Sequence, residues 1–62
     1  MFGGGALSAG IHSYRVTVHA SQTVESFQYT GYAGEYARRA NLFMSRAHPT
    51  LTIRRIELDQ LD

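Results

Sequence analysis

The clearest pattern in the chain is an alternation of apolar and polar residues over positions 11–20. Its apolar side consists of Tyr14, Val16, Val18 and Ala20. Its polar side consists of Arg15, Thr17 and His19. A period of two, with β-branched and aromatic residues on one side, is typical of a strand that buries one face. The segment therefore predicts a half-buried β-strand.

A second strand is predicted over residues 24–30. One of its faces consists of Glu25, Phe27 and Tyr29, and the other includes Ser26 and Gln28. The polar residues 21–23, which separate the two segments, form a stretch short enough for a hairpin connection. Gly31 is expected to end the second strand.

The strongest helical pattern covers residues 33–46. At about 100° per residue, the apolar side of this helix consists of Tyr36, Ala37, Ala40, Phe43, Met44 and Ala47. The opposite side consists of Glu35, Arg38, Asn41, Ser45 and Arg46. His48 precedes Pro49, and a residue before proline is disfavoured in the α conformation. The helix is therefore expected to end at this point.

A third strand is predicted over residues 50–58, but its apolar positions change phase. They are Leu51, Ile53, Ile56 and Leu58. The first two are odd-numbered and the last two are even-numbered, so a regular strand would split them between faces. A β-bulge at Arg54 and Arg55 would return all four to one face. Alternatively the strand is regular and the last two contact another subunit; we favour the bulge.

These elements together predict an α+β fold in the order strand–strand–helix–strand. The helix covers one face of a three-stranded antiparallel sheet, and its return places the third strand beside the first. The other face is expected to be bare or covered by a second copy. Its expected side chains are Arg15, Thr17, His19, Gln28 and Thr52, which suit contact with water.

Residues 11–62 are expected to form this single small domain. Residues 1–10 contain four of the six glycines and no charge. Because glycine loses the most conformational freedom on ordering, we expect this segment to be a flexible lead-in. The alternative is that Phe2 and Leu7 dock in a groove of the domain.

The length of the chain limits its stability. A domain of 62 residues buries only about 60% of its unfolded surface, and such domains commonly need a disulfide, a metal or a partner subunit. The absence of cysteine excludes disulfides and thiolate metal sites. The three histidines are scattered and give no convergent zinc site. No metal or cofactor is therefore expected, and by elimination the protein is expected to self-associate.

The net charge is +1, which favours neither a strongly basic nucleic-acid binder nor an acidic mimic of DNA. All six cations are arginine, which suits bidentate, stacked or partly buried contacts; a compositional bias of the genome is the alternative explanation. No apolar run approaches the ~20 residues of a membrane-spanning helix. Residues 1–10 lack the basic start of a signal peptide. A soluble, cytoplasmic protein is expected.

Catalysis is not expected from this sequence. A catalytic acid, base or nucleophile needs a pocket with a supporting shell, and so short a chain has little interior from which to build one. Glu57 and Asp59 form a close carboxylate pair on one strand face, which we interpret as solvated. The three glycines at positions 3–5 have neither the lysine nor the following helix of a phosphate-binding loop.

Two binding surfaces are candidates. Leu42 points away from the apolar side of the helix, and with Tyr32 and Tyr36 it would form an amphipathic patch rimmed by arginine, which is typical of protein interfaces. The alternative is a nucleic-acid-binding surface that consists of Arg38, Arg39, Arg46, Arg54 and Arg55. Tyrosines would stack on bases there, although glutamates interrupt the basic surface.

Two short segments carry a resemblance to a known family. Residues 13–18 read Ser-Tyr-Arg-Val-Thr-Val, and residues 26–31 read Ser-Phe-Gln-Tyr-Thr-Gly. With the following helix and the ending near Leu58 and Asp59, they resemble the small inhibitor of uracil-DNA glycosylase found in Bacillus phages. The similarity covers most of residues 13–59.

This resemblance implies a phage protein without catalytic activity, which mimics DNA and acts as a homodimer in the host cytoplasm. An apolar pocket of the dimer would capture the side chain that the glycosylase inserts into the minor groove during DNA repair. Glu35 and Tyr36 match the contact pair of the family in reversed order. The expected contact residues are Tyr29, Tyr32, Glu35, Tyr36 and Leu42. The family is acidic, unlike this chain, and the alternative function is a small arginine-rich nucleic-acid-binding or regulatory module.

Overall fold

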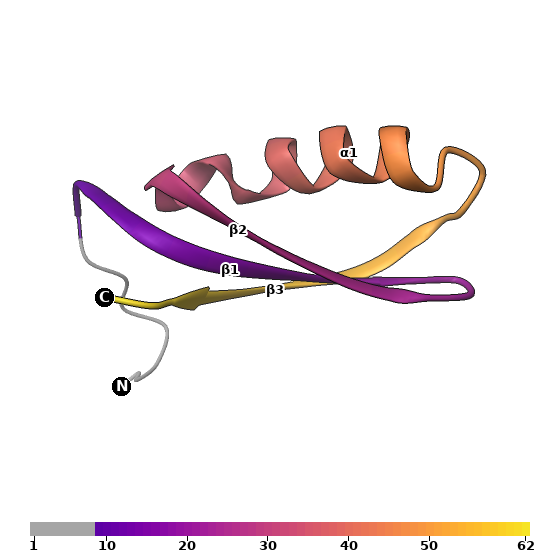
Figure 1. Cartoon of the computed structure of the whole chain (residues 1–62), viewed down its shortest axis with the longest axis horizontal. Helices are drawn as coiled ribbons and strands as arrows, with labels where there is room; N and C mark the ends of the chain where they lie inside the picture. Colours follow the sequence, from indigo (N-terminus) through magenta and orange to yellow (C-terminus); the bar gives the residue numbers. More distant parts are fainter. Residues whose placement is uncertain (1–8) are drawn as a thin grey trace.

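The structure, a computed structural model, describes residues 9–62. The elements in chain order are β1 (Ile11–Ala20), β2 (Val24–Tyr32), the 3-10 turn η1 (Ala33–Glu35), α1 (Tyr36–Ala47) and β3 (Ile53–Gln60). Figure 1 shows α1 lying over one face of the sheet, with no element over the other face. The α+β fold predicted from the sequence is confirmed. The predicted lead-in over residues 1–10 falls almost entirely outside the described residues.

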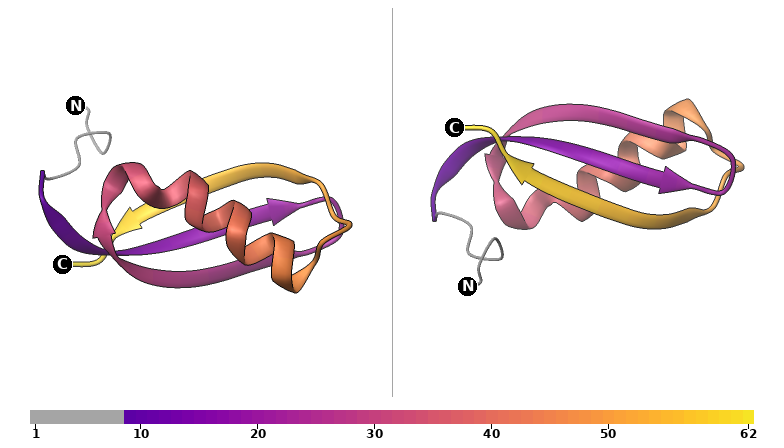
Figure 2. Two further views of the ribbon diagram at one scale, coloured as in Figure 1. Left: turned by 90° about the horizontal axis from the view of Figure 1, so that it is seen from above. Right: turned by 90° about the horizontal axis from the view of Figure 1, so that it is seen from below.

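β1 is the central strand of an antiparallel sheet with the order β2-β1-β3, as the sequence predicted. A tight turn joins β1 to β2, and in it the amide of Ala20 donates to the carbonyl of Thr23 at 2.9 Å. The register between these two strands has no irregularity along its length. β2 and β3 are therefore the two edge strands of the described sheet (Figure 2).

β3 contains the β-bulge that the sequence pattern favoured. His19 lies opposite Arg55, but the next residue of β1, Ala20, lies opposite Ile53. Arg54 is therefore an extra residue on β3, and the strand changes phase there. The side chains of β3 that pack against the core are Ile53, Ile56 and Leu58. Leu51 precedes the strand and lies outside this set.

Several predicted boundaries were wrong by a few residues. β2 continues through Gly31 to Tyr32, because the extended backbone goes on pairing with β1 there. β3 begins three residues after position 50 and continues two residues past Leu58. The helical segment begins as a 3-10 turn at residues 33–35, and Ala47 in its last turn is exposed, not buried. The end of the helix at His48 is confirmed.

The core forms where α1 crosses the central strand. Three side chains of β1, those of Tyr14, Val16 and Val18, are fully buried. Ala40 and Met44 of α1 pack on them. The residues around this centre are only partly buried: Ala20, Phe27, Ala33, Tyr36, Phe43, Ile53, Ile56 and Leu58. Cover by the helix is thus complete over the middle of β1 and incomplete over the two edge strands.

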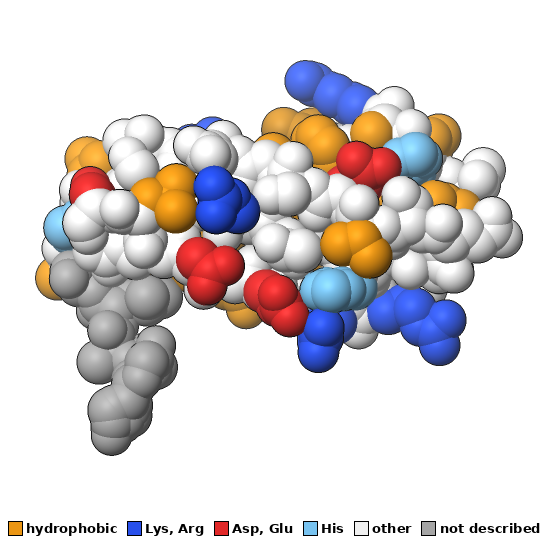
Figure 3. Space-filling model, turned by 60° about the horizontal axis from the view of Figure 1, so that its bottom comes forward, with side chains coloured by type: hydrophobic (Ala, Val, Ile, Leu, Met, Phe, Trp, Pro, Cys, Tyr) orange, Lys and Arg blue, Asp and Glu red, His pale blue; other side chains and the backbone are white. Residues whose placement is uncertain are grey.

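The bare sheet face is polar, as predicted. The register places Arg15, Thr17 and His19 of β1 on this face together with Gln28 of β2. Arg55 approaches Glu57 at 3.0 Å and the His19 ring at 3.1 Å. Figure 3 shows basic, acidic and histidine side chains lying side by side on this side of the molecule. Within residues 9–62, no helix has the length and apolar character needed to cross a membrane.

Two buried tyrosines give opposite predictions when their hydroxyls are removed. The Tyr14 hydroxyl has no hydrogen-bond partner within residues 9–62, and leaving a buried hydroxyl unpaired costs about 1–3 kcal/mol. Tyr14→Phe is therefore expected to raise the free energy of unfolding by about 1 kcal/mol. The Tyr29 hydroxyl donates to the Tyr32 carbonyl at 2.8 Å, so Tyr29→Phe is expected to lower it by about 1 kcal/mol.

Urea denaturation, followed by circular dichroism, measures both free energies. The two variants remove the same atom from neighbouring rings, 5.4 Å apart between centroids, so each is the control for the other. A loss of stability in Tyr14→Phe would mean that its hydroxyl is hydrogen-bonded in solution.

Candidate functional site

A groove of about 580 Å³ lies between α1 and the edge strand β2. Its lining residues are Phe27, Gln28, Tyr29, Arg38, Arg39, Leu42, Phe43, Arg46 and Ala47. α1 crosses the sheet obliquely, so that part of β2 lies at the margin of the area that the helix covers (Figure 2). We call this feature the α1–β2 groove.

The floor of the α1–β2 groove is aromatic. Phe27 of β2 and Phe43 of α1 stack with their ring centroids 4.8 Å apart and an interplanar angle of 21°. Tyr29 lies beside them and is almost fully buried. Leu42 forms part of the wall and remains 52% exposed. An apolar side chain from another molecule would therefore remove Leu42 and the open edges of both phenylalanines from water.

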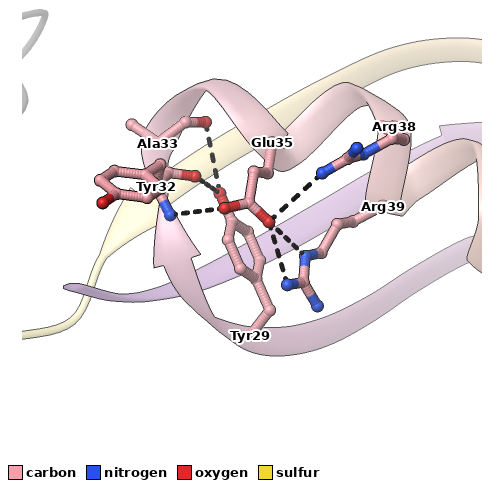
Figure 4. Close-up of polar contacts among 6 residues, drawn as sticks. All are labelled: Tyr29, Tyr32, Ala33, Glu35, Arg38 and Arg39. Carbon is pink, nitrogen blue, oxygen red and sulfur yellow. Dashed lines mark hydrogen bonds and ion pairs between the residues drawn. The ribbon is translucent and has the colours of Figure 1, made fainter. Parts of the chain in front are cut away.

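Beside one end of the groove, at the turn from β2 to α1, the carboxylate of Glu35 contacts the lining residues Arg38 and Arg39 (Figure 4). Its Oε2 accepts the backbone N–H of Tyr32 at 3.0 Å. Its Oε1 accepts the Nε and Nη2 of Arg39 at 3.1 and 3.0 Å. The carboxylate packs closely on Gly31, where a Cβ would lie 3.0 Å from Oε2 of Glu35, so a side chain at this position would push the carboxylate outward. Gly31 and Glu35 together therefore fix the start of the helix.

Tyr29 completes the same end of the groove. Its hydroxyl donates to the carbonyl oxygens of Tyr32 and Ala33, at 2.8 and 3.3 Å. The guanidinium carbon of Arg39 lies 4.8 Å from the centre of the Tyr29 ring, which is a cation–π arrangement. Figure 4 shows Arg39 held between the Glu35 carboxylate and this ring. Arg39 is thus fixed in position by the protein itself.

Near the other end of the groove, the side chain of Glu25 contacts that of His48. Oε2 of Glu25 lies 2.8 Å from Nε2 of His48 and accepts the Thr23 hydroxyl at 3.1 Å. This contact ties the start of β2 to the residue that follows α1. The α1–β2 groove therefore has a polar clamp at each end and an apolar floor between them.

The two clamps perturb the acidity of their carboxyl groups. The pKa of Glu35 is lowered, chiefly because its carboxylate accepts the Tyr32 N–H, and further by the hydrogen bonds from Arg39. The pKa of Glu25 is lowered by the hydrogen bond with His48 and then by that from Thr23. Burial raises the pKa of the Tyr29 hydroxyl. Both carboxyl groups are therefore held in their charged form by partners within the protein.

The rim of the groove is positively charged. It consists of Arg38, Arg39 and Arg46, all from α1. Glu35 neutralises Arg39 and lies 3.6 Å from Arg38, whose side chain is 80% exposed. No carboxylate within residues 9–62 forms an ion pair with Arg46. Arg38 and Arg46 therefore keep hydrogen-bond donors available to another molecule.

The structure divides the predicted protein-binding residues between different places. Tyr29 and Leu42 line the α1–β2 groove, and Glu35 supports its end. Tyr36 is partly buried against the core and does not line the groove. Tyr32 is 56% exposed, and the β1–β2 register places it on the bare face of the sheet with Gln28. The expected continuous patch of Tyr32, Tyr36 and Leu42 is therefore absent from the described residues.

The predicted basic surface is also divided. Arg38, Arg39 and Arg46 lie together at the groove, above the β2 edge. Arg54 and Arg55 lie on β3, at the opposite edge of the sheet. Arg55 is engaged with Glu57 and His19. The five arginines therefore form two separate sites and not one track for a nucleic acid.

Sequence reasoning did not predict the aromatic floor of the groove. Phe43 was expected on the apolar side of the helix and Phe27 on one face of the second strand, and the structure stacks the two rings at the floor of an open groove. The capping role of Glu35 was also missed, because the usual sequence signal is Ser or Thr three residues before Glu, whereas Tyr32 stands at that position. Comparison with known protein families, with curated proteins and with solved structures finds no match to this chain. Within residues 9–62, no three His, Cys, Asp or Glu side chains are grouped so that they would hold a metal ion.

The lowered pKa of Glu35 predicts how acid destabilises the fold. Its carboxyl has an ordinary value of 4.5 and a lower one in the folded protein. The stability that it contributes is therefore fully present above pH 4.5 and is lost as the pH falls through the lower, folded value. Glu35→Gln keeps an acceptor for the Tyr32 N–H but cannot be protonated in this range.

We expect the free energy of unfolding of Glu35→Gln to fall less steeply below pH 4.5 than that of the original protein. Some dependence remains, because the Glu25 pKa is also lowered. Urea denaturation at a series of pH values gives both slopes. Equal slopes would mean that Glu35 has the same pKa in the folded and unfolded protein.

Proposed function

We propose that this protein is a non-catalytic protein-binding module, and that its α1–β2 groove captures an apolar side chain of an acidic protein partner. The observation that supports this is the combination of an aromatic floor, an exposed Leu42 and an arginine rim in one groove. Burying one apolar side chain there contributes roughly 1.5–3 kcal/mol. Arginine at the rim of an aromatic pocket is also typical of the residues that dominate protein interfaces.

The charge of the groove favours an acidic partner. Arg38 and Arg46 have donors that the described chain does not use fully, and the nearby carboxylates of Glu25 and Glu35 are already paired. A carboxylate on either side of the captured side chain would form bidentate contacts with these guanidinium groups. The same charges would slow the approach of a basic partner.

Binding of single-stranded nucleic acid is less well supported by this geometry. Bases are held mainly by stacking on free aromatic faces. In the groove, Phe27 and Phe43 stack on each other, and Arg39 lies over the Tyr29 ring. The nucleic-acid hypothesis combined five arginines into one surface, but in the structure they lie near two opposite edges of the sheet. The arginine-rich module therefore remains a second proposal, supported by the three arginines of the groove.

Inhibition of uracil-DNA glycosylase is a narrower form of the proposed function. The groove offers the apolar capture that this inhibitor mechanism requires. The rim, however, is basic, and a surface that binds DNA is itself basic because it neutralises phosphates. Support for this partner therefore comes from the resemblance in residues 13–59, and the charge of the groove opposes it.

A synthetic peptide that alternates glutamate with leucine tests the proposed function directly. Fluorescence polarisation is expected to show binding that weakens as salt rises. Leu42→Asp places a charge at the apolar wall, and Arg46→Glu reverses a rim charge; each is expected to weaken binding at least about tenfold, the equivalent of about 1.4 kcal/mol. Arg54→Glu, at the opposite edge, is the matched control and is expected to bind as before.

A peptide with lysine in place of glutamate is the control for charge and should not bind. No binding of the acidic peptide, or equal binding by the Leu42→Asp variant, would contradict the proposal for this groove. Circular dichroism of each variant verifies that the fold is retained.

Release of uracil from a uracil-containing oligonucleotide by a bacterial glycosylase tests the narrower proposal. If the resemblance reflects function, release stops at about one dimer of this protein per enzyme, and Leu42→Asp restores it. If the basic rim prevents binding to the basic DNA-binding surface of the glycosylase, release of uracil is unchanged even at a large excess of this protein. The second result is expected from the basic rim, and inhibition without binding to the oligonucleotide would overturn our preference for an acidic partner.

A further inference from the structure

The two edges of the sheet differ in how well they are protected against pairing with another strand. β3 has a bulge at Arg54 and carries charged side chains at Arg55, Glu57 and Asp59. Bulges and charges are the features by which natural sheets prevent pairing at an edge. β2 has a regular register along its length, no proline and a single charged residue, Glu25. Within residues 9–62, no strand covers its free side.

The hydrogen-bonding pattern identifies which backbone groups of β2 face outward. In an antiparallel pair, hydrogen-bonded and non-hydrogen-bonded residue pairs alternate. The bond from the Ala20 amide to the Thr23 carbonyl marks a hydrogen-bonded pair. By alternation along the register, the N–H and C=O groups of Ser26, Gln28 and Thr30 point away from β1. Tyr32 follows the same rule, and its outward N–H is the group that Glu35 accepts.

These outward groups lie beside the α1–β2 groove. Ser26, Gln28 and Thr30 flank Phe27 and Tyr29, which line its floor. Figure 2 shows the C-terminal half of α1 crossing toward the β2 side of the sheet. A strand added next to β2 would lie about 4.8 Å from it, beneath this part of α1. Every second side chain of the added strand would then point toward the groove.

We propose that the partner of the α1–β2 groove binds as an extended acidic segment that forms a fourth strand on β2. This inference rests on the proposed function and specifies the partner of the same site. Backbone groups of Ser26, Gln28 and Thr30 bind the segment, and the groove takes one apolar side chain from it. Carboxylates two positions to either side of that side chain share its face of the strand and bind Arg38 and Arg46. Main-chain bonds provide affinity and the groove selects sequence, as in other cases of strand addition.

A second copy of this chain fits the edge less well. Pairing β2 with β2 of another copy would bring Arg38, Arg39 and Arg46 of both copies toward one junction. Glu35 is the only carboxylate paired with this group within the described residues, and it is already engaged by Arg39. The like charges would repel each other at short range, whereas an acidic segment neutralises them.

A second peptide, Glu-Ser-Leu-Ser-Glu, in which both carboxylates share the strand face of the leucine, is the probe for this inference. Amide hydrogen exchange measured by NMR is expected to slow at Ser26, Gln28 and Thr30 when the peptide binds. The Phe27 amide, which belongs to a hydrogen-bonded pair with β1, is the internal control and should change little. Unchanged exchange at all three outward amides in the presence of bound peptide would overturn the inference.

Proline at position 28 removes the central outward donor. Proline is tolerated in an edge strand where its nitrogen faces away from the sheet, and Gln28 is exposed. Gln28→Pro is expected to weaken peptide binding about tenfold or more, and to weaken it more than Gln28→Ala, which keeps the donor. Equal binding by both variants would overturn strand addition.

Methylated peptides test the same bond from the other partner, on the unaltered protein. One peptide carries N-methyl groups on its leucine and glutamate nitrogens and another on its serine nitrogens, so each blocks one edge of the added strand. Only the version that blocks the edge facing β2 is expected to lose binding. Equal binding of both versions would overturn the inference even if Gln28→Pro fails to fold.

The inference and the proposed function fail in different ways. If Leu42→Asp and Arg46→Glu abolish binding but the backbone tests have no effect, the groove binds a side chain without strand addition. If the free protein is a dimer by sedimentation equilibrium, and its Ser26, Gln28 and Thr30 amides are already protected, the occupant of the edge is a second copy. Either result would overturn the fourth-strand proposal.

Discussion

The structure depends on one geometric constraint: a single helix must cover a sheet that is longer than itself. α1 has 12 residues, which gives about 18 Å, whereas a strand of ten residues such as β1 spans about 33 Å. The helix therefore buries the middle of β1 fully and the outer strands in part. The uncovered margin over β2 becomes the α1–β2 groove. The candidate site thus arises from the small size of the domain, because a larger domain would cover this margin with a second helix.

Most of the fold could be predicted because its signals are local. The alternation in residues 11–20 identified the central strand, and the helical period with Pro49 identified the end of α1. The phase change in the last strand indicated a bulge, although the sequence also allowed a regular strand with a second apolar surface. What decided between these was the register of β3 on β1, since Ile53, Ile56 and Leu58 gain cover only on one face. This burial depends on the packing of β3 against β1 and α1, which the local sequence pattern does not specify.

The candidate site was harder to predict, because it depends on how the helix lies on the sheet. The predicted patch joined Leu42, on the outer side of the helix, to Tyr32 and Tyr36 near its start. The structure separates these residues, because Tyr36 packs against the core and β2 carries Tyr32 to the other sheet face. Leu42 was correctly expected on the outer side of the helix. Its companions in the groove are Phe27 and Phe43, which the sequence pattern placed on one face of the second strand and on the apolar side of the helix.

The bulge in β3 has a consequence for how this molecule can assemble. Chains with two open sheet edges can join edge to edge repeatedly, and each addition exposes a new edge for the next. Here the extra Arg54 and the neighbouring charges disfavour the pairing of a further strand with β3. The open β2 edge then allows a single joining event per molecule. If a strand pairs with the β2 edge as proposed, this molecule would end a ladder of strands and not extend it, and one strand would bind per molecule.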